Sequence, residues 1–265
     1  MRDLTALIIT FNERENIERT IAALSWVERI VIVDSFSTDD TIALARAMRP
    51  DVIVVERAFD SFARQCNFGL EQIATSWVLS LDADYVVTAE LADEIKTLEP
   101  AAQVRGFSAG FRYCVFGHRL RTTIYPPRAV LYRRDSARYE DEGHGHKVRI
   151  DGSVQALRGK IEHDDRKPLS RWLQSQDAYF KIEARHLLAT PNEQLNRQDR
   201  LRKKIFFAPW VVLVYLLIGQ SLIFDGWPGW YYAFQRSLAE TLLSLRLLTE
   251  REHLEGTASP SNERH

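Results

Sequence analysis

Short apolar runs alternate with amphipathic stretches through the first part of the chain. Four runs share an apolar, β-rich composition that predicts buried strands: residues 4–10, 26–33, 51–56 and 77–81. The stretches between them end near Leu24, Met48 and Ile73 and have helical spacing. Asn12 and Glu15 have the spacing of a helix capping box, so we expect a helix to begin beside the end of the first strand. Strands that alternate with helices in this way predict an α/β fold with a doubly wound, mixed but mostly parallel sheet.

Polar residues follow three of these strands. Asn12 and Glu13 come after the first, Asp34 ends the second, and Asp82 and Asp84 come after the fourth. Ligands of open α/β sheets bind outside the carboxyl ends of the strands. Two acids placed there are costly unless a positive group joins them, and oxygen ligands suit Mg²⁺ or Mn²⁺, which also hold substrate phosphates. The pattern predicts a metal–diphosphate site, with two solvated acids in a turn as the alternative.

The second half predicts an extension of the sheet and further helices. Strands are expected at residues 106–115, 128–132 and 154–161, and a core-covering helix at 169–188. A basic loop with His118, Arg119 and Arg121 joins the first two of these strands. Residues 125–128, YPPR, are rigid because proline fixes φ, and they would suit the wall of a cleft.

Composition limits the class of protein. A length of 265 residues suits one large domain, or one domain with an appendage. The net charge of −1 and 45% hydrophobic residues indicate a folded body without a charged tail for nucleic acid, so no nucleic-acid partner is expected. Cys66 and Cys114 offer neither a disulfide framework nor a CxxC spacing, which fits a reducing compartment. No apolar leader follows Met1, so we expect the main body to stay in the cytosol.

A long uncharged segment lies late in the chain. Residues 206–224, FFAPWVVLVYLLIGQSLIF, directly follow a polar segment with a cluster of basic residues: Arg197, Arg200, Arg202, Lys203 and Lys204. The segment is just long enough to cross a hydrocarbon core of about 30 Å. Pro209, Gly219 and Gln220 interrupt it, and an aromatic patch and an amphipathic helix at 234–252 follow. We favour monotopic insertion at an anionic leaflet; a single spanning helix and a buried helix of a soluble homo-oligomer are the alternatives.

Four segments of the first half together resemble a known family. They are residues 8–13 (IITFNE), 33–39 (VDSFSTD), 62–70 (FARQCNFGL) and 81–84 (LDAD). In this order they are similar to family 2 of the inverting glycosyltransferases, and more narrowly to the branch that contains the lipopolysaccharide-core β-glucosyltransferases. The third segment departs from the family pattern because Cys66 stands where arginine is usual, and Arg64 would supply that charge from the previous helical turn.

The resemblance implies a GT-A fold that binds a nucleotide sugar, with UDP-hexose preferred. It implies that these residues contact the donor: Thr10, Asn12, Glu13, Asp34, Arg64, Asn67 and Asp82. Asp84 would ligate a divalent cation, Mn²⁺ or Mg²⁺, with Asp82 near the ribose or a metal-bound water. A cation on the diphosphate is chemically reasonable, because the departing nucleoside diphosphate gains negative charge as the glycosidic bond breaks.

An inverting transfer also needs a general base opposite the leaving group. By position in the family pattern it would come from residues 139–147, YEDEGHGHK, where we prefer Glu142 and then Asp141; a solvated acidic turn is the alternative. Related transferases often have His-Glu where this chain has His146 and Lys147. His163 follows a strand and would complete the metal shell or contact phosphate, unless it is structural.

These features predict a metal-dependent, non-processive hexosyltransferase acting on a lipid-linked, lipopolysaccharide or exopolysaccharide acceptor. Gln235 and Arg236 lack the QxxRW spacing of processive enzymes. Residues 1–190 would form the catalytic domain, with the donor half in 1–100 and the acceptor half in 101–190. Residues 191–255 would associate with the cytoplasmic face of the inner membrane, and 256–265 would be disordered. The alternatives are a membrane-associated nucleotide-sugar binder without catalysis and a Mg²⁺-dependent phosphoryl-transfer enzyme.

Overall fold

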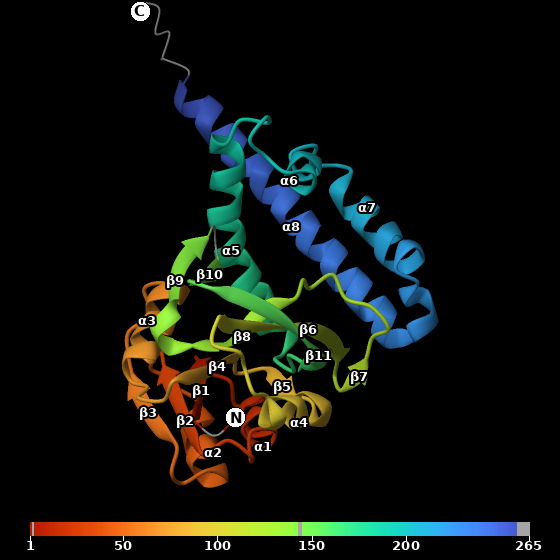
Figure 1. Cartoon of the computed structure of the whole chain (residues 1–265). Coiled ribbons are helices and arrows are strands. Elements are labelled where there is room, and N and C mark those ends of the chain that lie inside the picture. Colours follow the sequence, from red (N-terminus) through yellow and green to blue (C-terminus); the bar gives the residue numbers. More distant parts are fainter. Residues whose placement is uncertain (2, 143–144, 259–265) are drawn as a thin grey trace, which may run out of the picture. The chain divides into compact units, whose positions relative to one another are not determined.

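The computed structural model of the protein describes residues 1, 3–142 and 145–258. The chain forms two compact units, Met1–Lys167 and Pro168–His265 (Figure 1). The predicted helix at 169–188 therefore belongs to the second unit, whereas the sequence groups it with the catalytic domain.

The first unit is built on one mixed sheet with the strand order β3-β2-β1-β4-β8-β6-β11-β5, and β7 pairs with β6 at its side. Its strands are β1 (Leu4–Thr10), β2 (Arg29–Asp34), β3 (Ile53–Glu56), β4 (Trp77–Asp82), β5 (Tyr85–Val87), β6 (Val104–Val115), β7 (His118–Arg119), β8 (Arg128–Arg133) and β11 (Ser153–His163). The first four pair in parallel, as predicted. The other half is mixed, because β8 runs antiparallel to β4 and β6 while β11 runs parallel to β6.

The parallel register brings the polar strand ends to one edge. Thr10 lies opposite Asp34, and Ile9 lies opposite Asp82. Three carboxyl ends of neighbouring strands therefore finish at nearly the same level, which is the place where ligands of such sheets bind.

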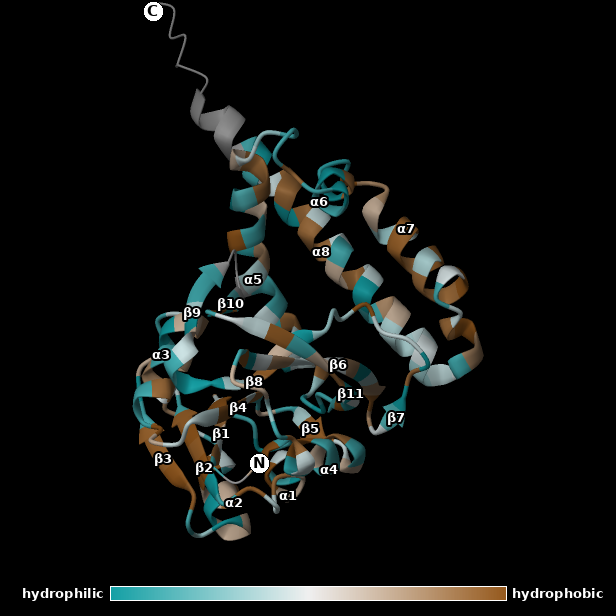
Figure 2. Ribbon diagram, in the orientation of Figure 1, coloured by the Kyte–Doolittle hydropathy of each residue, from teal (hydrophilic) through white to brown (hydrophobic). Residues whose placement is uncertain are grey.

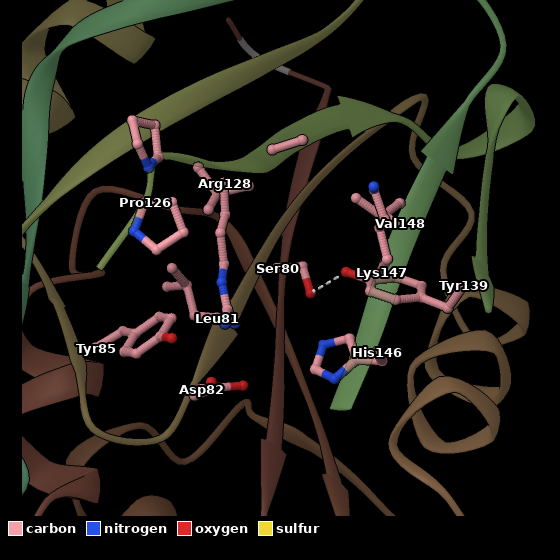
Figure 3. A pocket seen from close by; sticks show the side chains of 13 residues that line it. Ser80, Leu81, Asp82, Tyr85, Pro126, Arg128, Tyr139, His146, Lys147 and Val148 are labelled. Carbon is pink, nitrogen blue, oxygen red and sulfur yellow. Dashed lines mark hydrogen bonds between the residues drawn. The ribbon is translucent and has the colours of Figure 1, made fainter. Parts of the chain in front are cut away.

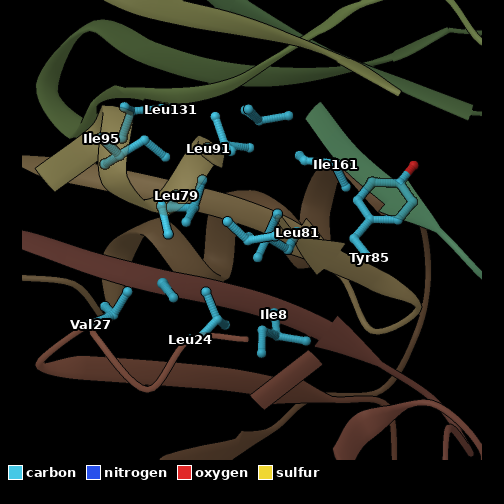
Figure 4. Close-up of a cluster of buried hydrophobic side chains, with 14 of the residues drawn as sticks. Ile8, Leu24, Val27, Leu79, Leu81, Tyr85, Leu91, Ile95, Leu131 and Ile161 are labelled. Atoms are coloured by element: carbon cyan, nitrogen blue, oxygen red, sulfur yellow. The ribbon is translucent and has the colours of Figure 1, made fainter. Parts of the chain in front are cut away.

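Apolar side chains cover both faces of the sheet. On one face, Leu79 and Leu81 pack with Leu91 and Ile95 of α4 (Ala89–Thr97), as Figure 4 shows. The opposite face carries a second cluster that includes Leu7, Val31 and Val78. Burial on both faces explains why these strands appear in the sequence as near-continuous apolar runs rather than as alternating patterns.

Three helices complete the half of the first unit that contains β1 to β4: α1 (Ile17–Ala22), α2 (Thr41–Met48) and α3 (Phe62–Glu71). Helix α3 lies close to the sheet at Gly69, where a Cβ atom would come within 2.5 Å of Leu7 Cδ1. A larger residue there would push the helix away from the strands.

The predicted capping box at Asn12 is wrong. Helix α1 begins at Ile17, and its N-cap is Asn16. Asn12 instead takes a left-handed conformation with φ 53°. Its side-chain oxygen accepts hydrogen bonds from the backbone N–H groups of Thr38 and Asp39, at 2.7 and 3.3 Å. The side chain therefore joins two loops at the strand ends, which satisfies more backbone donors than a local cap would.

Residues 137–150 form strands that the sequence does not predict. Strands β9 (Ala137–Glu142) and β10 (Gly145–Ile150) pair antiparallel as a separate two-stranded sheet. Gly143 and His144, between them, lie outside the described residues.

The second unit is helical. It contains α5 (Leu169–Ala189), α6 (Arg197–Arg202), α7 (Ala208–Val214), a π-helical turn (Tyr215–Gly219), a 3-10 turn (Leu222–Asp225) and α8 (Trp227–Ala258). Its core gathers apolar side chains of α5, α8 and the segment between them: Ala184, Leu187, Leu195, Ile205, Leu243 and Leu247. Residues 256–258, predicted to be disordered, belong to α8, and 259–265 lie outside the described residues.

A single helix across residues 206–224 is not formed. The segment divides into α7 and two further turns, and Ser221 takes a left-handed conformation with φ 58°. Within the described part of the chain, no helix combines the length and the apolar character needed to cross a bilayer. The spanning-helix alternative is therefore wrong for this segment.

Candidate functional site

An open pocket of about 430 Å³ lies beside the carboxyl end of β4, within the size range of small-ligand sites (Figure 3). Asp82, Tyr85 and Arg128 gather on one side of it, and His146 of β10 faces them. Pro126 and Pro127 line it as well. The rigid YPPR segment therefore contributes to a cleft wall, as the sequence predicts.

The charge state of Asp82 depends on its surroundings. Burial raises the pKa of the Asp82 carboxyl, and the negative charge of Asp84 raises it further. Burial also lowers the pKa of His146, against the opposing effect of Asp82. A cation at this corner would remove the repulsion between the two aspartates and favour the ionised form of Asp82.

Asp84 and His163 form a buried pair. Strand β11 runs antiparallel to β5 with His163 opposite Tyr85, which places the imidazole beside Asp84. The distance from His163 Nε2 to Asp84 Oδ2 is 3.1 Å. Burial acts to raise the pKa of Asp84, but His163 and its hydrogen bond outweigh it and lower that pKa to about 2. Conversely, Asp84 overcomes the effect of burial and raises the pKa of His163.

Aromatic rings enclose this imidazole. The ring centroids of Tyr85, Tyr113 and Tyr125 lie 4.9–5.2 Å from that of His163. Its Nδ1 atom is buried and has no hydrogen-bond partner among the residues that the structure describes. Tyr85 lines the neighbouring pocket, so one ring separates the His163–Asp84 pair from the space beside Asp82.

Lys167 carries a positive charge close to these acids. Its Nζ lies 2.7 Å from Glu13 Oε1 and 3.6 Å from Asp165 Oδ1. Burial would lower the pKa of Lys167, but Glu13, Asp84 and Asp165 raise it. Burial raises the pKa of Glu13 to about 7, although Lys167 opposes this change. In this structure Glu13 is a partner of Lys167 at the end of β1, and its contact with a nucleotide sugar stays a prediction.

The remaining residues of the predicted donor site divide into two groups. Asp34 is almost fully buried, and its two oxygens accept hydrogen bonds from the backbone N–H and the hydroxyl of Ser37, at 2.7 and 2.5 Å. Thr10 Oγ1 is buried and, in the described part of the chain, has no hydrogen-bond partner. Together with Asn12, these residues build the loops at the ends of β1 and β2.

Arg64 and Asn67 lie elsewhere on α3. The Arg64 side chain is 70% exposed, and its Nη1 lies 3.2 Å from Asp60 Oδ2. The Asn67 side chain donates to the Tyr139 carbonyl and accepts from the Tyr139 N–H, both at 2.9 Å. In this structure Arg64 pairs with Asp60, which lies just before α3, and Asn67 joins α3 to β9.

The two candidate bases lie at the end of β9. Asp141 Oδ2 accepts a hydrogen bond from the Ser61 hydroxyl at 3.0 Å, and Oδ1 accepts one from the Ala63 N–H at 3.3 Å. An acid at the first turn of α3 is stabilised by the helix dipole. Glu142 ends the strand, and its side chain lies outside the described residues.

A divalent cation fits this corner only with substrate groups as additional ligands. Among the residues that the structure describes, no group of three His, Cys, Asp or Glu side chains could hold a metal. Asp84 and Asp82 nevertheless offer carboxylate oxygens on either side of Ala83, and Mg²⁺ commonly binds one or two carboxylates together with substrate phosphates and water. The donor set thus suits an ion that arrives with a diphosphate.

The sequence does not single out Lys167, Tyr85 or His146 as site residues. Lys167 follows the DDR segment after β11, so its position after a strand end is the one signal that could have identified it. His146 and Tyr85 depend on strand pairing, which the sequence does not reveal.

Comparison with known proteins agrees with the sequence motifs. The model of the family "Glycosyl transferase family 2" matches residues 5–146, more than half of the chain. An uncharacterized glycosyltransferase of Rickettsia felis is 37% identical over 97 residues, which are 36% of this chain and 34% of that protein. The chain thus aligns with about a third of the length of this relative. The lipopolysaccharide core biosynthesis glycosyltransferase LpsC of Rhizobium meliloti is 26% identical over 252 residues, covering 87% of this chain and 89% of LpsC.

Two solved structures are similar at low identity. S. aureus TarS 1-349 has a TM-score of 0.46 and 12% identity, over 96% of this chain and 91% of that one. Glucosyl-3-phosphoglycerate synthase from Mycobacterium tuberculosis, in complex with Mn²⁺, UDP and phosphoglyceric acid, has a TM-score of 0.46 and 15% identity, over 72% of this chain and 80% of that one. At this similarity, the ligands are properties of those proteins alone. The family match, which spans β1 to β10, shows that this protein belongs to glycosyltransferase family 2.

Proposed function

We propose that the protein transfers a hexosyl group from a nucleoside diphosphate sugar, UDP-hexose by preference, to a glycan acceptor with inversion of configuration. The observation that supports this most strongly is the arrangement at the end of β4. There the buried Asp84–His163 pair lies one aromatic ring away from a pocket of about 430 Å³ lined by Asp82, Arg128 and His146.

The donor would lie across the ends of β1, β2 and β4. Thr10, Asn12 and Asp34 shape the loops that would surround the nucleoside. A bound Mn²⁺ or Mg²⁺ would neutralise charge on the departing diphosphate. Asp84 and Asp82 would hold that cation, and the buried His163 would orient the Asp84 carboxylate through its hydrogen bond. Lys167, held charged by Glu13 and Asp165, would supply a fixed positive charge near the same phosphates.

The acceptor would enter the pocket beside β10. Arg128 and His146 offer hydrogen-bond donors and an acceptor to sugar hydroxyls there. Glu142 remains our proposed general base. Asp141 is the second choice, because both of its oxygens already accept hydrogen bonds from the start of α3. The likeness to LpsC over most of the chain supports a lipopolysaccharide-type acceptor, with lipid-linked or exopolysaccharide glycans as related forms.

Membrane association would bring such an acceptor to the enzyme. The π-helical turn continues α7. Together with the N-cap Phe207, the two present exposed apolar residues that recur on successive helical turns: Phe207, Trp210, Val211, Val214 and Ile218. Figure 2 shows the hydrophobic residues along α7. Trp210 and Ile218 are each 69% exposed, and such concentrations of exposed apolar side chains mark interaction sites. With the basic segment just before it, this apolar face would insert into the cytosolic leaflet in the plane of the membrane.

A donor panel tests the proposal. Thermal unfolding of the full chain is measured with UDP, GDP, dTDP and CMP sugars, with and without Mn²⁺. We expect one nucleotide sugar to stabilise the protein in a metal-dependent manner, and we expect Asp84→Ala to abolish the shift. Asp93→Ala, an exposed acid on α4, is the matched control and should respond as the wild type does. Transfer to a lipopolysaccharide-core acceptor with an inverted anomeric centre would complete the test. If no nucleotide sugar stabilises the protein, the proposal is wrong.

A further inference from the structure

A second pocket lies within the helical unit, outside the proposed active site. It is open, has a volume of about 480 Å³ and is lined by Leu188, Asn192, Arg200, Lys203, Lys204 and Arg251. Four of these six residues carry a positive charge, and none is acidic. A pocket of this composition suits an anion with several oxygen atoms, because arginine and lysine together offer many converging donors.

Backbone carbonyl groups hold three of the four basic side chains in place. Arg200 Nε donates to the Leu195 carbonyl at 2.8 Å, and Lys203 Nζ donates to the Thr190 carbonyl at 2.7 Å. Arg251 Nη2 donates to the Lys203 carbonyl at 3.4 Å. Each bond uses one donor and leaves others available, since arginine has five and lysine three.

Carboxylates do not neutralise this cluster in the described part of the chain. Arg200, Lys203, Lys204 and Arg251 form no ion pair with any acid described there. Arg202, in the same segment, shows the contrast, because its guanidinium pairs with Glu240 at 3.0 Å and also with Glu183 and Asp199. Glu183, Asp199 and Glu240 thus pair with Arg202 rather than with the residues that line the pocket.

Apolar residues directly follow the last basic residue of the segment that lines this pocket. Lys204 is followed by the buried Ile205 and then by Phe206 and Phe207, which are 72% and 62% exposed. Ile205 has φ 55°, so the chain turns sharply between the basic segment and the exposed aromatic residues. The basic side chains would suit the phosphate of a lipid head group, and the exposed aromatic side chains that follow them would suit its acyl chains.

We propose that this pocket binds the phosphoryl group of an anionic lipid head group, while the apolar face that begins at Phe207 lies among the acyl chains. The inference rests on the proposed membrane association but not on glycosyl transfer. It adds a specific head-group site to what would otherwise be a diffuse attraction between a basic surface and an anionic leaflet.

The test measures binding of the full chain to three kinds of vesicle. One is neutral phosphatidylcholine, one contains phosphatidic acid, and one contains oleate at the same surface charge but without phosphate. We expect the tightest binding to the phosphatidic acid vesicles. The double variant Arg200→Gln/Lys204→Gln should lose about 30-fold in partition, since each basic residue near an anionic surface contributes roughly a fivefold effect. Lys204→Gln alone should lose about fivefold, and its exposed side chain makes misfolding a small concern.

The control double variant Arg185→Gln/Arg197→Gln removes the same charge from exposed positions of the same unit that do not line the pocket. Its partition onto phosphatidic acid vesicles should fall clearly less than that of the pocket variant. Equal losses in the two double variants, or equal binding to phosphate and oleate vesicles, would show diffuse electrostatics and overturn the proposal. Binding of glycerol phosphate in solution without any vesicle preference would also overturn it, in favour of a soluble anion.

These outcomes are separate from those for the proposed function. Asp84→Ala should bind vesicles as the wild type does, and the pocket variants should keep the stabilisation by nucleotide sugar. If the wild type shows no preference for phosphatidic acid vesicles but is still stabilised by a nucleotide sugar, that result counts against the lipid site alone.

Discussion

The charged groups at the sheet edge near β4 and those near the end of α6 differ in whether they have partners of opposite charge. At this edge of the sheet, Asp84 after β4 and Glu13 after β1 are each held by a cationic partner, His163 and Lys167, within 3.1 Å. In the helical unit, three of the four basic side chains of the second pocket donate to backbone carbonyls, and none pairs with an acid among the described residues. A site with internal partners has its geometry fixed before a ligand arrives, whereas a surface without them is stabilised when an external anion binds.

The helical unit itself provides the control for this contrast, because Arg202 is fully paired. Arg202→Ala would leave the nearly buried Glu240 without its cation, so we expect a loss of about 3–5 kcal/mol in the stability of this unit. Hydrogen exchange should show faster opening of α6 and α8 and unchanged protection in β1 and β4. Arg202→Met combined with Glu240→Leu should recover most of the loss. If Arg202→Ala leaves exchange unchanged, the paired cluster is not structural.

Asp84→Asn tests whether the paired acids also serve chemistry. The amide keeps the shape of the side chain but removes the negative charge, so the cation would lose a ligand. We expect the rate of sugar transfer to fall by about 10²–10³-fold, which is typical for loss of one electrostatic contact in a transition state. Asp93→Asn is the control and should keep the wild-type rate. A fall of less than a few-fold for Asp84→Asn would contradict the assigned role.

The same pair predicts how stability changes in acid. The pKa of Asp84 is about 2 in the folded protein and 3.8 for an ordinary aspartate. The ionised Asp84 carboxylate therefore adds about 2 kcal/mol to the free energy of unfolding above pH 4, and this contribution is lost as the pH falls towards 2. The raised pKa of His163 acts in the opposite direction: its contribution is complete below pH 6.5 and is lost as the pH rises through the folded value. The denaturant concentration at the unfolding midpoint should fall more steeply from pH 5 to pH 2 for the wild type than for Asp84→Asn. If the midpoint falls equally in both proteins, the Asp84–His163 pair does not contribute this stability.

The smallest expected effect on stability comes from the exposed apolar face. Phe207→Ala/Trp210→Ala removes two side chains that are 62% and 69% exposed, so little buried area is lost. We expect the free energy of unfolding to change by less than about 0.5 kcal/mol. Partition into anionic vesicles should fall strongly. A large loss of stability would show that this face packs against protein rather than lipid.

The order of the elements in the first unit could be predicted from the sequence because it depends on local patterns. The apolar runs correctly locate β1 to β4, and the acids that follow β4 do lie at the carboxyl edge of the sheet. Residues 128–132 and 154–161 also form strands as expected. These predictions succeed because burial on both faces of a sheet leaves a direct record in the amino-acid types.

Contacts across long separations could not be predicted in the same way. His163 meets Asp84 because β11 pairs with β5. His146 faces Asp82 because β10 pairs with β9 in the separate two-stranded sheet. The Asn12 side chain could accept hydrogen bonds from the start of α1 or from the loop at Thr38. In the structure it accepts from the Thr38 N–H. Such choices depend on which elements become neighbours.

The sequence by itself determined the α/β class, the positions of the acids at the strand ends, and the run of basic and then apolar residues in the second unit. Only the tertiary structure decided that residues 206–224 break into α7 and two turns, and that Lys167 joins Glu13. The physical reason is that hydrophobic periodicity records whether a residue is buried, whereas the partner of a buried or charged group is set by packing between distant parts of the chain.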